Sequence, residues 1–475
     1  MNAMSVRCRP AAGVPFVGNF NDMKLIRNQF AKVGQTGLLA LIVLTFIGLS
    51  FGQGTGTNLA SQTNLVTELD VNGLKVLIKR RPNSQTVAAG LFFRGGARNL
   101  TTENAGIESF MLNVATEGSV KFPRETLRRE LARTGSSISS GANYDYSVLA
   151  LASTRMNFDR SWEIFTDIAL NPAFAQNDVE LTREKVLTSL RDDEDDPDGF
   201  LQVLVNKTIN AKTAYENDPS GTIENIGRMS PQDLRAYHQK AMQTSRLLLV
   251  IVGDLDPNVL QQRIAASFGK LPRGSYQDPP LTPFDFSKPT LDVTSRNLPT
   301  NYIQGVFEAP SIKNPDFYAM RVATTILRDR VFEEVRVKRN LSYAPSADMG
   351  SLASNTGNIY VTAVDANQAI SVMLNEINSL KTVPVNERDI SGVSGQFLTT
   401  YFIGQETNAA QAAELARYEL VGGGWRNAFG FLDRVKQVTP ADVQRVAQKY
   451  MKNIRFVVLG KPEFINRQVF LGQTD

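Results

Sequence analysis

Two stretches of this sequence, far apart along the chain, follow one pattern and decide the fold. Residues 229–254 read MSPQDLRAYHQKAMQTSRLLLVIVGD, and residues 438–462 read VTPADVQRVAQKYMKNIRFVVLGKP. They align at an offset of 209 residues through Pro231 and Pro440, Asp233 and Asp442, and Lys240 and Lys449. A two-residue gap then aligns Gly253 with Gly460. Each copy predicts a helix that starts at Ser/Thr-Pro, followed by a buried β-branched strand that ends at glycine.

A repeat at this distance is too long for a solenoid and indicates two tandem domains of one fold. Between the copies, residues 270–292 are rich in proline and show little periodicity, which marks a linker. We therefore expect an α+β protein built from two tandem, homologous α/β sandwich-like halves. The first half is predicted to span 55–275 and the second 290–475, with a linker at 276–289.

Residues 1–52 are expected to be a leader. From Met23 onward, three basic residues precede a mostly apolar run at 37–51, which is the order of a secretory signal peptide. The run is short for a membrane span, which usually needs about 20 residues. We expect export to the periplasm or the extracellular space, with an uncleaved membrane anchor at 37–51 as the alternative. Because the charged region starts at Met23, that residue is a candidate for the true start.

The charge balance argues against a nucleic-acid partner. The leader holds five basic residues and one acidic residue, so the net charge of +4 belongs to it and the mature chain has 46 of each. A nucleic-acid-binding protein would present a basic face or stripe. The only cysteine, Cys8, also lies in the leader, which excludes disulfides and thiol chemistry from the mature protein.

The whole sequence contains one histidine, His238. Tight zinc sites draw on histidine and cysteine as well as carboxylates, and Ser-His-Asp triads need a histidine base. A mature chain with one histidine and no cysteine can hardly build either site. The repeat has Ala447 at the matching position, so we expect a structural role for His238.

The first half is expected to alternate strands and helices. An Asn72-Gly73 pair predicts a hairpin within the first strands. Hydrophobic periodicity predicts strands at 64–95, a helix at 104–116, further strands at 136–154 and long helices at roughly 157–211.

Two further stretches carry a resemblance to a known family. Residues 105–119 read AGIESFMLNVATEGS, a short helix in which Ser109 and Asn113 share one face. Residues 330–347 read RVFEEVRVKRNLSYAPSA. With the tandem halves, these stretches make essentially the whole mature chain resemble the insulinase/pitrilysin-type zinc peptidases, which include mitochondrial processing peptidase.

Members of that family carry a His-x-x-Glu-His motif within GxxHxxEHxxFxGT, and a further Glu about 76 residues after the second His. Glycines bracket the same interval in this sequence. The resemblance places Ser109 and Asn113 where the two histidines would be, and Leu112 where the base would be. It places Ser189, within TREKVLTSLRDDEDDP, where the distal ligand would be. All four positions are replaced.

These replacements remove the chemistry that the motif supplies. In the motif, two histidine nitrogens and a carboxylate hold zinc, and the helix Glu takes a proton from the bound water. Serine hydroxyls and an asparagine amide are weak neutral ligands, and Leu112 accepts no proton. We predict no metal and no cofactor in this chain, and no peptidase activity by this chain alone. The plain interpretation of Ser109 and Asn113 is that they are ordinary helix polar groups, satisfied locally.

Arg336 and Tyr343 lie seven residues apart in the second quoted stretch. The resemblance implies that an Arg and a Tyr at this spacing contribute to substrate binding and transition-state stabilisation across the cavity from the zinc. Both side chains are suitable donors to a peptide carbonyl or a developing oxyanion. In two-chain members, one subunit carries zinc and its partner has lost zinc but carries this pair, which is the pattern here. The plain alternative is a surface charge and a core aromatic near a turn.

The sequence therefore predicts an exported subunit that pairs with a zinc-bearing homologue as a heterodimer, zinc being held only by that partner. The pair would enclose a peptide substrate and contact it through Arg336 and Tyr343. The alternative is a non-enzymatic scaffold or peptide-binding subunit of the same fold, like the core subunits of respiratory cytochrome complexes. An independent hydrolase would need a Ser-Lys pair, and no spacing indicates one.

Three other stretches have plain explanations. The acidic run at 191–199 lacks the ligand spacing and the loop glycine of a known calcium loop, so we expect a solvated helix end. The glycines at 421–427 predict a helix stop. Those at 95–99 predict a tight turn before the 104–116 helix.

Overall fold

The computed structural model describes residues 62–472. The expected leader at 1–52, with its apolar run at 37–51, lies outside these described residues. The strands are β1 (Val66–Val71), β2 (Leu74–Arg80), β3 (Thr86–Arg94), β4 (Ser137–Ala142), β5 (Tyr146–Thr154), β6 (Leu247–Gly253), β7 (Thr290–Ser295), β8 (Asn301–Ala309), β9 (Ser346–Met349), β10 (Asn355–Ala363) and β11 (Arg455–Gly460). Within 62–472, none of the helices has the length and apolar character needed to cross a membrane.

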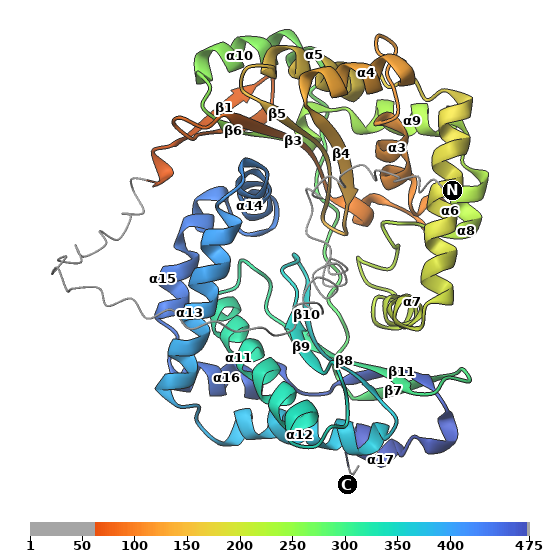
Figure 1. Cartoon of the computed structure of the whole chain (residues 1–475), viewed down its shortest axis with the longest axis vertical. Helices are drawn as coiled ribbons and strands as arrows, with labels where there is room; N and C mark the ends of the chain where they lie inside the picture. The colour runs from red at the N-terminus through yellow and green to blue at the C-terminus, as the bar shows by residue number, and fades with distance from the viewer. Residues whose placement is uncertain (1–61, 473–475) are drawn as a thin grey trace, which may run out of the picture.

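Helices connect and cover the strands in both halves (Figure 1). They are α3 (Ile107–Ala115), α4 (Arg124–Thr134), α5 (Phe158–Leu170), α6 (Gln176–Asp195), α7 (Pro197–Ile209), α8 (Ile223–Arg228), α9 (Pro231–Ala241), α10 (Pro257–Ala266), α11 (Asp316–Val331), α12 (Ala366–Thr382), α13 (Glu387–Gly404), α14 (Asn408–Val421), α15 (Phe431–Lys436), α16 (Pro440–Tyr450) and α17 (Arg467–Leu471). Residues 271–289 run between the halves without a helix or strand.

Each half contains one sheet, and the two sheets share a topology. The first sheet has the order β1-β2-β6-β3-β5-β4 and the second the order β7-β11-β8-β10-β9. β2 pairs with β6 in parallel, as β7 does with β11, and the other neighbours are antiparallel. The two strands of the repeated stretches, β6 and β11, occupy matching positions. The prediction of an α+β chain with two tandem halves is confirmed.

The repeated helices α9 and α16 begin with the same local structure. The Ser230 hydroxyl accepts a hydrogen bond from the Asp233 backbone N–H at 3.2 Å, and the Asp233 carboxylate accepts from the Ser230 N–H. Thr439 and Asp442 make the same reciprocal pair, also at 3.2 Å. Two otherwise unpaired N–H groups are thus satisfied at each helix start, which explains why both copies of the sequence keep this spacing.

Other local predictions also match the structure. Asn72 and Gly73 have φ angles of 55° and 83° and join β1 to β2 as a hairpin. The acidic run ends α6, and the carboxylate of Asp196 accepts from the Gly199 N–H at 3.0 Å to cap α7. The predicted helix at 104–116 is α3, and the glycines after Val421 end α14.

Each half places one of its helices against the sheet of the other half. α14 of the second half packs on β3 and β6 of the first sheet, and α7 of the first half packs on β8 and β11 of the second sheet (Figure 1). One apolar core therefore spans both halves, joining residues such as Phe92 and Val250 to Leu415. A smaller core forms around α7, where Leu201 and Val205 meet Val457. Burial of these side chains fixes the halves against each other.

A polar contact joins the tips of the two matching hairpins. Asp145, between β4 and β5, pairs with the buried Arg98 at 3.1 Å and accepts from the Ala353 N–H, between β9 and β10, at 2.8 Å. Tyr215 donates to Asp145 at 2.9 Å and accepts from the Ser354 N–H at 2.9 Å. Burial raises the pKa of Asp145. These directional bonds set how the hairpin tips meet.

Candidate functional site

Helix α3 lies between β4 and α6, and its start is fixed by a close approach of backbone. Gly106 has a φ of 90°, and a Cβ there would come within 2.6 Å of the Cα of Gly221. Only glycine fits this position without strain. The helix then buries Phe110, Met111 and Val114 in the core of the first half.

The structure places the four motif positions on two neighbouring helices. Ser109 and Asn113 are half-buried on α3, whereas Ser189 is exposed on α6, which packs against α3. Leu112 is only 2% exposed and belongs to the core of the first half. The Asn113 amide oxygen accepts a hydrogen bond from the hydroxyl of Ser140, on edge strand β4, at 2.8 Å. Asn113 is therefore satisfied by a tertiary contact that sequence spacing did not indicate.

This donor set does not fit zinc. Two hydroxyls and an amide offer neutral, weak oxygen ligands, and Leu112 offers none. Across residues 62–472, no three His, Cys, Asp or Glu side chains gather into a group that could hold a metal ion. His238 is half-buried on α9, with Nε2 2.9 Å from the Ala169 carbonyl oxygen and its ring edge-on to Phe174. Burial lowers the pKa of His238, in keeping with a neutral structural side chain.

Sequence reasoning missed Glu108, next to Ser109 on α3. Glu108 is 1% exposed, and its carboxylate forms an ion pair with the buried Arg246 and accepts from the Tyr237 hydroxyl at 2.8 Å. Tyr237 lies on α9, so its hydrogen bond to Glu108 ties α3 to the repeated helix. The acid in the first helical turn was visible in the sequence, but its partners lie more than 120 residues away.

In the second half, a wide helical turn positions Arg336. α11 continues into a π-helical turn at Phe332–Val337, where the Lys338 N–H donates to the Glu333 carbonyl at 2.9 Å. Asn340, with a φ of 51°, then reverses the chain toward β9. π-helical turns are rare in proteins overall, but many of those that occur lie at functional sites.

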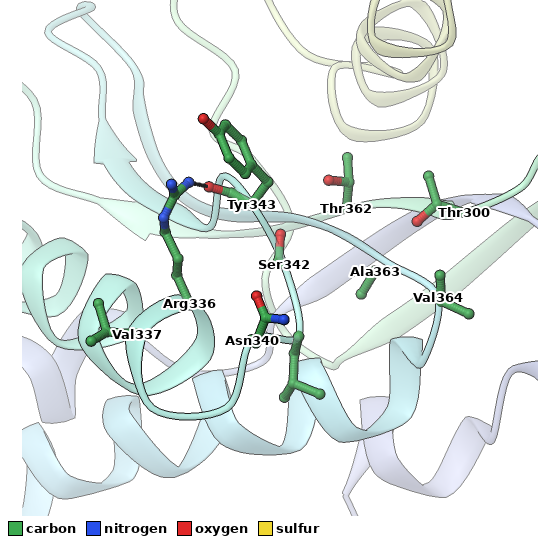
Figure 2. A pocket seen from close by; sticks show the side chains of 10 residues that line it. Thr300, Arg336, Val337, Asn340, Ser342, Tyr343, Thr362, Ala363 and Val364 are labelled. Carbon is green, nitrogen blue, oxygen red and sulfur yellow. Dashed lines mark hydrogen bonds between the residues drawn. The ribbon is translucent and has the colours of Figure 1, made fainter. Parts of the chain in front are cut away.

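Arg336 and Tyr343 lie side by side. The guanidinium donates to the backbone carbonyl of Tyr343, and its Cζ lies 3.8 Å from the Tyr343 ring centroid (Figure 2). The centroid of the Phe332 ring also lies 5.4 Å from Cζ. Tyr343 is 68% exposed, so it is not a core aromatic. Both side chains of the pair are accessible to a ligand.

The pair lines a pocket of about 470 Å³, called the Arg336 pocket below. The lining residues are Thr300, Arg336, Val337, Asn340, Leu341, Ser342, Tyr343, Thr362, Ala363 and Val364. Figure 2 shows Thr300 and Thr362 across the pocket from Arg336 and Tyr343. Nothing in the sequence pattern indicates this opposite wall, because it forms only when β8 and β10 pair.

Two family models match the chain and together cover more than half of it. Residues 75–222 match the model described as insulinase (peptidase family M16), and residues 228–396 match the model described as the peptidase M16 inactive domain. The chain belongs to the M16 peptidase family. The first match lies within the first half, whereas the second begins at residue 228, before α9 of the first half, and continues into the second half. The resemblance to this family is confirmed.

Several M16 relatives match over most of the chain. An uncharacterized zinc protease of Streptomyces coelicolor is 21% identical over 395 residues, covering 79% of this chain and 85% of the relative. The beta subunit of the mitochondrial processing peptidase of Blastocladiella emersonii is 23% identical over 414 residues, covering 82% and 88%. Subunit 1 of the Bos taurus cytochrome b-c1 complex is 24% identical over 270 residues, or 55% of each chain.

Solved structures share the fold. A protease from Helicobacter pylori superposes with a TM-score of 0.76 at 15% identity, covering 83% of this chain and 99% of that one. The first half of the periplasmic protease PqqL from Escherichia coli gives a TM-score of 0.68 at 15% identity, covering 86% and 95%. At these identities the likeness establishes the M16 fold alone.

Proposed function

We propose that this chain is a non-catalytic M16 subunit that binds peptides together with a zinc-bearing homologue. In this proposal the partner supplies the zinc, and this chain supplies Arg336 and Tyr343 to a shared peptide site. The observation that carries the proposal is the contrast between the halves: α3 has no metal-ligand set, while the Arg336 pocket is open and accessible.

The state of α3 supports the loss of intrinsic activity. Leu112 fills core space where a general base would need access to water, and Asn113 is held by Ser140. Without a metal ligand set or a proton acceptor at these positions, the chain has no means of activating water for peptide cleavage there.

The geometry at Arg336 supports peptide binding. A guanidinium and a phenol are hydrogen-bond donors with the right chemistry for a peptide carbonyl or a developing oxyanion. Strand β4, whose outer edge is unpaired within the described sheet, runs beside α3. An extended peptide can add to such an edge through main-chain hydrogen bonds.

The leader and one structural neighbour support export. The expected signal peptide precedes the described residues, and the PqqL structure is that of a periplasmic protease. We propose that the mature chain works outside the cytoplasm, in the periplasm or the extracellular space.

Reconstitution tests the proposal. The purified chain should contain no stoichiometric zinc by elemental analysis and should not cleave peptides. A zinc-bearing homologue from the same source should co-purify with it, and the pair should cleave peptides faster than the homologue alone. Arg336→Ala should reduce that gain, whereas Arg339→Ala, at an exposed site just after the π-helical turn, should not. Tight stoichiometric zinc in this chain, or unchanged cleavage with Arg336→Ala, contradicts the proposal.

A second candidate is a non-enzymatic scaffold or peptide-binding subunit. It is favoured by the match to subunit 1 of the cytochrome b-c1 complex, a named component of a larger complex. The same reconstitution separates the candidates, because a scaffold would form a stable complex that shows no gain in peptidase activity.

A further inference from the structure

We propose that the Arg336 pocket receives a carboxylate of the bound peptide. The inference rests on the proposed peptide-binding function and adds what the pocket selects. The carboxylate has two sources in a peptide, the C-terminus or an Asp or Glu side chain, and the pocket chemistry is the same for both.

The first observation is the unbalanced charge of Arg336. Its neighbours Lys338 and Arg339 both form ion pairs with Glu334, the Lys338 pair at 2.6 Å. Within residues 62–472, Arg336 makes no ion pair with any carboxylate, and its one hydrogen bond goes to the Tyr343 carbonyl. An anionic ligand gains binding free energy from a half-buried guanidinium that has no counter-ion of its own.

The second observation is the composition of the pocket wall. None of the lining residues is acidic, and Arg336 is the one charged residue among them. The polar groups of Asn340, Thr300 and Thr362 can all donate hydrogen bonds. Val337 and Val364 add apolar surface at the same pocket. The wall therefore offers donors and apolar contact, but no repulsion, to a carboxylate attached to a side chain or chain end.

The third observation is that the guanidinium is held in place. Figure 2 shows the Tyr343 ring beside the guanidinium, which donates a hydrogen bond to the Tyr343 carbonyl. The Phe332 ring also lies near the guanidinium. A fixed guanidinium loses less side-chain entropy when it binds, and its planar fork suits a carboxylate. The pocket volume of about 470 Å³ lies within the usual range for small-ligand sites.

Four versions of one fluorescein-labelled nine-residue peptide test the inference on the full chain. One ends in a free carboxylate, one in an amide, and two amidated versions carry Asp or Asn at the eighth position. Fluorescence anisotropy should show about tenfold tighter binding of a version with a carboxylate than of its neutral match, as expected for a charge-assisted hydrogen bond. The free-acid pair and the Asp/Asn pair report on the two sources separately.

Arg336→Gln should abolish the preference, and Arg336→Lys should retain part of it, because the charge remains while the fork is lost. Arg339→Gln, which lies outside the pocket lining, should keep the full preference. Thermal unfolding of each variant checks that the fold is intact. Equal binding of all four peptides by the unaltered chain overturns the carboxylate inference and leaves peptide binding standing. No binding of any peptide overturns the carboxylate inference and peptide binding by this chain alone, whereas the reconstituted pair tests the shared site.

Discussion

α3 and α11 are matching helices in two halves of one fold, but the regions around them have diverged. Each follows the same strand of its sheet, β3 or β8, and packs against the edge strand, β4 or β9. Around α3, Leu112 is packed into the core and Asn113 is hydrogen-bonded to β4. Beyond α11, the chain opens into a pocket lined by Arg336. The half that carries the expected motif positions is closed at α3, and the other half presents an accessible pocket.

Both helices are also anchored by an acid in the first turn. Glu108 contacts Tyr237 on α9, and Asp316 accepts from the Tyr450 hydroxyl on α16 at 2.9 Å. The Glu108 pair is buried, whereas the two cations that contact Asp316 are half exposed. Both halves therefore keep a first-turn acid that bonds a tyrosine on the repeated helix, although this contact is more deeply buried in the first half.

Leu112→Glu should cause the largest effect, because it tests whether the α3 region is closed. A carboxylate placed in this core without a partner should lower the free energy of unfolding by about 3–5 kcal/mol, measured by urea denaturation. Val120→Glu, at a residue that is 73% exposed in the first half, should change it little. If Leu112→Glu were as well tolerated as the control, α3 would border open space and the contrast between the halves would fail.

Glu108→Gln should have the next largest effect. It removes one member of a buried ion pair and leaves Arg246 without a counter-ion, which should cost about 3 kcal/mol of unfolding free energy. Glu125→Gln removes an exposed acid from nearby α4 and should cost less than about 0.5 kcal/mol. Urea unfolding of both variants measures this difference. Equal midpoints would show that the Glu108 ion pair contributes nothing to the free energy of unfolding.

The sequence predicted what depends on local pattern. The repeat gave the two halves, and Ser230 and Thr439 marked two helix starts, because capping and periodicity act within a few residues. The resemblance singled out Arg336 and Tyr343, seven residues apart, but their stacking and the exposure of Tyr343 became visible only in the structure.

Long-range pairings could not be predicted in the same way. α7 packs on the second sheet and α14 on the first because of which apolar faces meet. Hydrophobic periodicity shows that a helix has an apolar face, but not which sheet that face will contact. The first-turn Glu108 resembles an ordinary helix-dipole acid in sequence, yet the fold buries it against Arg246. Thr300 and Thr362 reach the Arg336 pocket only through the pairing of β8 with β10.

Asp316→Asn should have a smaller, pH-dependent effect. Burial alone would raise the pKa of Asp316, but hydrogen bonds from Lys449, Arg445 and Tyr450 outweigh it and lower the pKa to about 2. A lowered pKa contributes stability above the unfolded value, and that stability is lost as the pH falls from about 4 toward 2. The variant should therefore lose about 1–2 kcal/mol at pH 7, less than the full shift implies because the cations are solvated.

The difference between Asp316→Asn and the unaltered chain should shrink steadily as urea unfolding is repeated from pH 5 down to pH 2. Glu308→Gln, at an exposed residue of β8, serves as the control and should show little difference at any pH. A difference that stays constant across this range would mean that the Asp316 charge is not what anchors α11.

The two helix caps should give the smallest effects and compare the halves most evenly. Ser230→Ala and Thr439→Ala each remove the same side-chain acceptor from the same position of a repeated helix. Each should cost about 1 kcal/mol of unfolding free energy in urea. Because the sites lie in different halves and share no partner, the double variant should lose about the sum of the two. The large core that spans both halves predicts one cooperative transition in all three variants. Separate transitions, each shifted by only one of the two substitutions, would show that α7 and α14 do not couple the halves.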